Sequence, residues 1–158
     1  MSQFISYQKK ILSNAIEYFK RNLEFIPEEK LTFKPSATSK SALQLAAHIG
    51  ITNKGFASQL RGEDSKFESL PTLLTWIDKE EKKYTTRIEV LKLLDESIQD
   101  LMNSIELLND DLLDQQVRSA AGSRSKRDSL VRVANHIFMH GAQIEYIQTI
   151  LGDIEPHL

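Results

Sequence analysis

The chain has 158 residues, 41% hydrophobic and 27% charged, a balance typical of one globular domain, which we expect to span residues 1–158. A formal net charge of −2 creates no global field that would recruit nucleic acid or an anionic membrane. The absence of cysteine excludes disulfides and thiolate ligands, so a metal site would need nitrogen and oxygen ligands.

The first ten residues, MSQFISYQKK, lack the basic segment and the long apolar segment of a signal peptide. No apolar run in the chain approaches the roughly 20 residues needed to span a bilayer. We therefore expect a cytoplasmic protein with no membrane partner and no nucleic-acid partner.

The first two predicted helices are separated by a connection that contains Pro27 and Pro35, which cannot lie inside a helix. The first helix is expected over about residues 3–22. The second opens at Ser41, which fits an S-x-x-Q capping box with Gln44, and it stops near Gly62. Their inward residues recur at helical spacing: Ile5, Leu12, Ile16, Phe19 and Leu23, then Ala42, Leu45, Ile49, Thr52, Phe56 and Leu60.

Residues 63–85 are broken by Pro71 and carry the segment LLTWIDKEEKK. This segment predicts a short extra helix packed over one end of the bundle. Its single tryptophan, Trp76, either caps a cavity or belongs to an ordinary core.

The third and fourth predicted helices have the clearest patterns. Thr86 and Glu89 form a capping box before a helix that continues to Leu112, and the last helix begins near Asp128 or Ser129 and ends at Gly152. No segment shows the sustained alternation of a strand. The sequence therefore predicts an all-α, up-down four-helix bundle with a short extra helix between helices two and three. The predicted inward residues are Ile88, Leu91, Leu94, Ile98, Leu101, Ile105, Leu108 and Leu112, then Val133, Ile137, His140, Ile144, Ile147 and Leu151.

A basic cluster lies in the linker RSAAGSRSKR, before the last helix. It could draw an anionic substrate toward a site below it, or it could be an ordinary solvated loop. Its members are Arg118, Arg124, Lys126 and Arg127.

The histidines carry the functional signal. His140 occupies a position that the pattern reserves for Ile or Leu, and His136 lies one turn earlier on the same face. An i, i+4 pair can place two imidazoles on one metal ion. His48, at the edge of the inward face of the second helix, can supply a third ligand if the two helices face each other. The alternative is that these are core histidines with ordinary hydrogen bonds.

Two segments resemble the DinB/YfiT-like metalloenzyme family. They are KLTFKPSATSKSALQLAAHI, which leads into the second helix, and NHIFMHGAQIEYIQTILGD in the fourth. The resemblance implies that His48, His136 and His140 take the places of the family's three metal ligands. Gln143 and Gly152 match the family's glutamine and closing glycine. The chain departs from the family at Gly141 and Ala142, where many members have Arg-Gly.

The resemblance also implies a class of function, since the family includes bacterial thiol S-transferases and its members are frequently dimeric. Three imidazoles leave coordination positions open, where an ion can acidify a water molecule or hold a substrate thiolate. We expect zinc or nickel, with iron or manganese as alternatives. The expected partners are a small-molecule substrate, such as a low-molecular-weight thiol, and a second copy in a homodimer, with Phe138 and Tyr146 as contact residues.

Two functional hypotheses follow. The first is a metal-dependent enzyme, either a thiol S-transferase or a small-molecule hydrolase. The second is a non-catalytic stress-response or interaction protein whose metal links two helices. No residue is assigned as a general base: Glu145 points away from the inward face, and Asn53 and Gln143 are amides near enough to hydrogen-bond a ligand. This absence favours activation by the metal itself.

Overall fold

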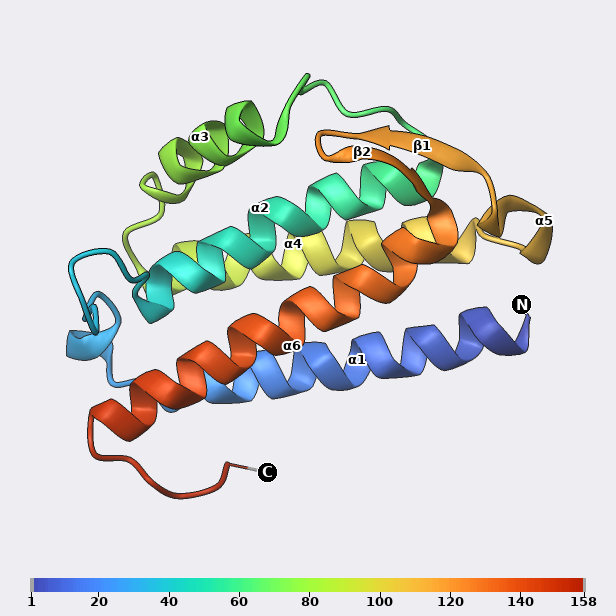
Figure 1. Cartoon of the computed structure of the whole chain (residues 1–158). Coiled ribbons are helices and arrows are strands. Elements are labelled where there is room, and N and C mark those ends of the chain that lie inside the picture. Colours follow the sequence, from blue (N-terminus) through green and yellow to red (C-terminus); the bar gives the residue numbers. More distant parts are fainter. Residues whose placement is uncertain (1, 158) are drawn as a thin grey trace.

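A computed structural model describes residues 2–157 and shows four long helices side by side (Figure 1). These are α1 (Gln3–Glu24), α2 (Ala42–Arg61), α4 (Arg87–Glu106) and α6 (Lys126–Ile150). The connections carry five shorter elements: η1 (Glu28–Lys30), α3 (Leu70–Glu81), α5 (Asp110–Leu113), β1 (Gln116–Ser119) and β2 (Gly122–Ser125).

The bundle is held by contacts of α2 with α4, of α1 with α6 and of α2 with α6. Because α3 returns the chain along the outside of the bundle, α2 and α4 run in the same direction and α1 and α6 run in the other (Figure 1). The predicted four-helix bundle with a short extra helix is confirmed, and this crossover replaces strict up-down alternation. Among the helices of residues 2–157, none combines the length and the apolar composition that a membrane span requires.

The predicted helix starts are confirmed where capping chemistry defined them. The Ser41 side chain accepts from the backbone N–H of Gln44 and the Gln44 side chain accepts in return, which satisfies two backbone donors at the start of α2. Thr86 and Glu89 form the same reciprocal pair at the start of α4. Gly62 ends α2 with φ +90°, a conformation that glycine adopts without steric cost.

The prediction that no strand is present is wrong. Strands β1 and β2 pair antiparallel, with Gln116 opposite Ser125 and Ser119 opposite Gly122. Each strand has only four residues, and Val117 is their one apolar side chain, so no alternation was visible in the sequence. The hairpin positions the start of α6, because Ser125 ends β2 and also caps the helix through the backbone N–H of Asp128.

The predicted bounds of the third and fourth helices need correction. Helix α4 ends at Glu106, and Asn109 caps the separate turn α5, so a single helix to Leu112 is wrong. Helix α6 begins at Lys126, earlier than Asp128 or Ser129. Ile88, predicted to face inward, is 79% exposed, because the inward face of α4 begins at Val90.

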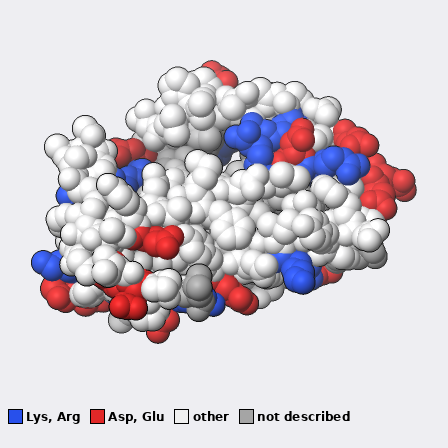
Figure 2. All heavy atoms as spheres, turned by 60° about the horizontal axis from the view of Figure 1, so that its bottom comes forward, with Lys and Arg blue, Asp and Glu red and all other residues white. Residues whose placement is uncertain are grey.

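A small apolar cluster attaches α3 to the bundle. Ile77 of α3 packs with Ile51 of α2 and Leu93 of α4, separately from the main core. A cavity of about 830 Å³ opens between α2, α3, the segment 63–69, the hairpin and α6. Figure 2 shows the molecule hollowed beside the hairpin, where Lys and Arg side chains gather.

The packing of α2 against α4 at Gly50 yields a prediction. A Cβ at Gly50 would lie 2.5 Å from Leu93 Cγ, whereas a Cβ at Gly55 would meet no atom within 4 Å. We expect Gly50→Ala to lower the melting temperature, because overpacking costs about 1–3 kcal/mol. Gly55→Ala, its matched control on the same helix, should raise the free energy of unfolding by up to about 1 kcal/mol through helix propensity. Thermal denaturation checks both, and equal stabilisation by the two changes would contradict the close packing at Gly50.

Candidate metal centre

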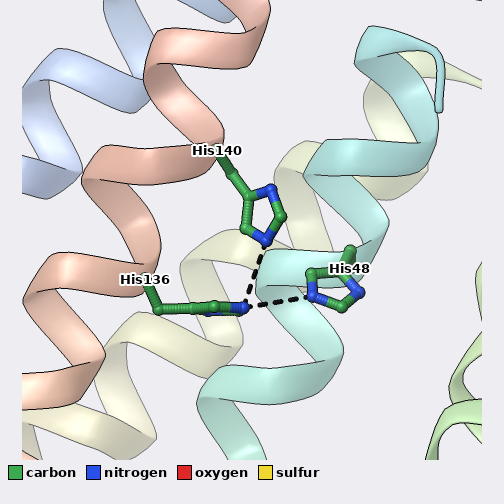
Figure 3. A group of neighbouring side chains, drawn as sticks. All are labelled: His48, His136 and His140. Carbon is green, nitrogen blue, oxygen red and sulfur yellow. Dashed lines mark hydrogen bonds between the residues drawn. The ribbon is translucent and has the colours of Figure 1, made fainter. Parts of the chain in front are cut away.

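Three imidazoles from two helices meet inside the bundle. His48 extends from α2, and His136 and His140 extend from successive turns of α6 (Figure 3). The Nε2 atom of His136 lies 3.2 Å from Nε2 of His48 and 3.1 Å from Nε2 of His140. The sequence-predicted convergence of His48, His136 and His140 is therefore present, with one nitrogen of each within 4.8 Å of the others.

Hydrogen bonds to the opposite ring nitrogens orient two of the imidazoles. His48 Nδ1 lies 2.7 Å from a carboxylate oxygen of Glu81, and His140 Nδ1 lies 2.6 Å from the amide oxygen of Gln143. Because both partners are acceptors, each Nδ1 carries the proton and donates it. The Nε2 atoms of His48 and His140 therefore present lone pairs toward the centre of the cluster.

This arrangement fits a shared metal ion better than mutual hydrogen bonds. If His48 and His140 both present lone pairs, one proton on His136 Nε2 can satisfy only one of them. The buried Nδ1 of His136 has no hydrogen-bond partner among the described residues, so no contact there prevents Nε2 from also presenting a lone pair. Tetrahedral zinc–nitrogen bonds place ligand nitrogens about 3.3 Å apart, close to the spacing found here. The three nitrogens could therefore hold a metal.

The surroundings of His136 and His140 favour the neutral form of both rings. Burial, together with the nearby His140 and His48, lowers the pKa of His136 to about 3. Burial also lowers the pKa of His140, although its hydrogen bond to Gln143 acts in the opposite direction. Neutral imidazole is the form that binds a metal, so protons compete weakly for this site near neutral pH.

Glu81 is a functional residue that the sequence analysis missed. It is 1% exposed at the end of α3, and its carboxylate contacts both His48 and the Lys40 ammonium group. Burial raises the pKa of Glu81, but the hydrogen bonds from His48 and Lys40 outweigh this effect and hold the pKa below its ordinary value. A signal was available: Glu81 lies one turn after Ile77 on the buried face of α3, where an apolar residue would be expected.

The cavity reaches the histidine cluster. His48 and His136 form part of its wall, together with apolar side chains that include Phe67, Leu73 and Trp76. Trp76 is half-buried and packs against Phe67 with ring centroids 5.1 Å apart, so it lines the cavity as the first of its two predicted roles suggested. The cluster is therefore placed where a small molecule in the cavity could contact it.

Three polar residues considered from the sequence have different positions. Gln143 contacts His140 rather than the cavity, and so it orients a ring. Asn53 is fully buried, and its amide nitrogen is 3.4 Å from Ser97 Oγ, away from the histidines. Glu145 accepts a hydrogen bond from the Tyr18 hydroxyl on the α1 side of α6, as expected for a residue that faces away from the site.

The close packing of Gly141 against α1 accounts for the chain's departure from the family pattern after His140. Gly141 is buried against α1, where a Cβ would come 2.6 Å from Tyr18 Cε1. Neither Gly141 nor Ala142 lines the cavity. The position that holds arginine in many family members therefore faces α1 in this chain.

The basic cluster before the last helix divides into separate roles. Arg118 donates to backbone carbonyls of Ser65 and Phe67, and Arg127 forms an ion pair with Asp114. Lys126 is 4% exposed. Of this cluster, Arg124 alone lines the cavity. Arg132 of α6, which the sequence analysis did not single out, also lies on the cavity wall.

The fold and the site define a four-helix-bundle protein with three clustered histidines that could hold one metal ion at the wall of a cavity. Residues 12–144 match the DinB superfamily, and the chain belongs to this family. No curated protein matches the sequence.

Two solved structures share the fold. A conserved protein from Enterococcus faecalis superposes with a TM-score of 0.73 at 15% identity, covering 96% of this chain and 99% of that one. A DinB-like protein from Bacillus subtilis, YjoA, superposes with a TM-score of 0.66 at 18% identity, covering 98% of this chain and 94% of that one. At these identities the likeness shows the fold alone.

Proposed function

We propose that the chain binds one divalent metal ion through His48, His136 and His140 and uses it in a reaction on a small molecule, as a thiol S-transferase or a small-molecule hydrolase. The observation that carries this proposal is the meeting of three imidazole nitrogens, two of them from residues that line a cavity of about 830 Å³. A closed structural site would have a fourth protein ligand, whereas this donor set leaves positions for an exogenous ligand.

Zinc or nickel suits three neutral imidazoles best, with iron or manganese as alternatives. Bound there, the ion would supply Lewis acidity that lowers the pKa of a coordinated thiol or water molecule. Glu81 and Gln143 would hold His48 and His140 in the orientation that binding requires.

The surrounding residues support activation by the metal rather than by a side-chain base. The Glu81 carboxylate lies behind His48 and outside the cavity wall, and its contacts with His48 and Lys40 occupy it. Glu80, which does line the cavity, is paired with Lys83 at 2.6 Å. The apolar wall formed by Leu73, Trp76 and other side chains would exclude water from a bound substrate.

The cavity also favours an enzyme over a protein in which the metal only links α2 to α6, because a structural link needs no adjoining space. A homodimer stays a prediction. Of its two proposed contact residues, Tyr146 is exposed, whereas Phe138 packs within the monomer against Tyr18 at a centroid distance of 5.8 Å.

Turnover assays on metal-loaded protein test the proposed reaction. The S-transfer assay supplies a low-molecular-weight thiol and a chromogenic aryl halide, so that a C–S bond forms while halide and a proton leave. The hydrolysis assay supplies small chromogenic esters and amides. We expect turnover in one assay that disappears on chelation and in His140→Ala. Rates equal to those of the chelated protein in both assays would overturn the enzymatic proposal and favour the structural link.

Glu81→Gln tests the positioning role of Glu81. Glutamine can still accept a hydrogen bond from His48 Nδ1, but it lacks the negative charge that strengthens the ligand. We expect metal affinity to fall roughly 10–100-fold, measured by competition with a chromophoric chelator. Asp78→Asn is the matched control, since Asp78 also lies on α3 but pairs only with the exposed Lys82. Unchanged affinity in Glu81→Gln would contradict the role.

A further inference from the structure

Two guanidinium groups lie on the cavity wall beside the histidine cluster. Arg124 extends from β2, and Arg132 extends from α6 one turn before His136, and all three residues line the cavity. Four residues of α-helix correspond to a rise of about 6 Å, so Arg132 lies close to the cluster along the helix. The hairpin brings Arg124 to the same wall because Ser125 both ends β2 and caps α6.

Neither guanidinium has a partner within residues 2–157: no hydrogen bond or ion pair involves the side chain of Arg124 or Arg132. Most arginines elsewhere are engaged, as Arg61 is with Asp100 and Arg87 is with Glu28. Arg21 of α1 is the exception among the described residues, and it does not line the cavity. Burial lowers the pKa of Arg124, and the charge of Arg132 lowers it further, while Asp128 acts in the opposite direction without forming an ion pair. Two neighbouring cations without an anion between them are electrostatically unfavourable, and a bound anion would relieve that cost.

The acidic side chains of the cavity wall are engaged with other groups. Glu63 pairs with Arg61 at 2.6 Å, and Glu80 pairs with Lys83. Asp64 accepts a hydrogen bond from the backbone N–H of Arg118. No carboxylate in the described part of the wall therefore neutralises the two arginines.

We propose that the cavity binds a small organic carboxylate, whose charged group lies between Arg124 and Arg132 and whose apolar body lies along Phe67, Leu73 and Trp76 toward the histidines. Guanidinium groups bind carboxylates through paired parallel hydrogen bonds, which a flat carboxylate matches in geometry. The apolar part of the wall favours a carbon-based ligand over an inorganic anion. The inference rests on the proposed function in one respect: this carboxylate is taken as the substrate of the metal-dependent reaction. Binding of the carboxylate itself does not require the metal.

Fluorescence tests the inference directly, because Trp76 lines the cavity and is the chain's only tryptophan. The probe is 4-phenylbutyrate, and its neutral control is 4-phenylbutyramide. We expect the carboxylate to bind the metal-loaded protein at least about 10-fold more tightly than the amide, since charge-assisted hydrogen bonds account for the difference. Raising the ionic strength should weaken the binding of the carboxylate and leave the binding of the amide unchanged. Equal affinity for the two compounds would overturn the inference.

Variants assign the effect to the two arginines. Arg124→Gln with Arg132→Gln should abolish the preference for the carboxylate. Arg127→Gln should retain it, because Arg127 pairs with Asp114 and does not line the cavity. Circular dichroism shows whether the double variant keeps its helicity. If the double variant does not fold, Arg124→Gln alone is the test, and it should reduce the preference for the carboxylate. Wild-type preference in a folded double or Arg124→Gln variant would overturn the inference.

Two further arms separate this inference from the proposed function. Inorganic phosphate should compete only weakly, and competition as strong as that of 4-phenylbutyrate would overturn the assignment to an organic acid. His140→Ala removes a proposed metal ligand that does not line the cavity. Arginine-dependent binding by this variant would support the carboxylate site even if no metal-dependent turnover exists. Turnover without arginine-dependent binding would overturn the carboxylate site and leave the proposed function intact.

Discussion

The His136→Ala variant is expected to lose its stoichiometric divalent ion while it keeps the helical circular dichroism spectrum of the wild type. His136 Nε2 is the central nitrogen of the cluster, within 3.2 Å of His48 Nε2 and 3.1 Å of His140 Nε2. Removing it leaves two imidazoles on different helices. The expected loss of affinity exceeds the roughly 10–100-fold effect of removing a group that only supports a ligand. Metal content after dialysis, measured by elemental analysis for zinc and nickel, checks this prediction.

His157→Ala is the matched control for this variant. His157 is the chain's fourth histidine and lies in the C-terminal tail, where it stacks on Phe25 and contacts Asp153. It is not part of the three-histidine cluster. Its replacement should leave the metal content unchanged. Retention of a full equivalent of metal by His136→Ala would show that the ion is bound elsewhere.

Metal binding should also raise the thermal stability of the chain. An ion that binds the folded state through α2 and α6 together should stabilise it by about 2.7 kcal/mol at a free concentration 100 times the dissociation constant. For a domain of this size, this corresponds to an increase of roughly 5–10 °C in the melting temperature. Differential scanning fluorimetry of chelator-treated protein, with and without added zinc or nickel, measures the shift.

The His140→Ala variant should show almost none of this stabilisation, because two remaining imidazoles bind the ion weakly. Its metal-free melting temperature is the reference for any structural effect of the substitution itself. If the metal raised the melting temperatures of wild type and variant equally, stabilisation would arise from ions bound outside the cluster.

The helices could be predicted where local chemistry determines them. The capping boxes at Ser41 and Thr86 fixed two helix starts, because both halves of each pair lie within four residues. The hairpin could not be predicted, since its strands offer one apolar residue and depend on contacts with the bundle for their position. The phase error at Ile88 arose because Val90 and Ile88 are both β-branched apolar residues near a helix start, where few turns define the inward face.

The histidine cluster could be predicted because two of its members share one helix face and the third lies on the inward edge of a facing helix. The groups around it could not. Glu81 reaches His48 across 33 residues of sequence, from a helix whose docking is set by Ile77 in a small separate cluster. Arg132 has the same spacing from His136 as His136 has from His140. It became notable only when the cavity was located beside it.

The most direct test is X-ray absorption spectroscopy at the metal edge of zinc- or nickel-loaded protein, combined with anomalous diffraction from crystals of the same sample. The account predicts one ion with three imidazole nitrogens at about 2.0–2.1 Å for zinc, supplied by His48, His136 and His140. A scattering pattern without imidazole, or an anomalous peak away from these three side chains, would contradict it.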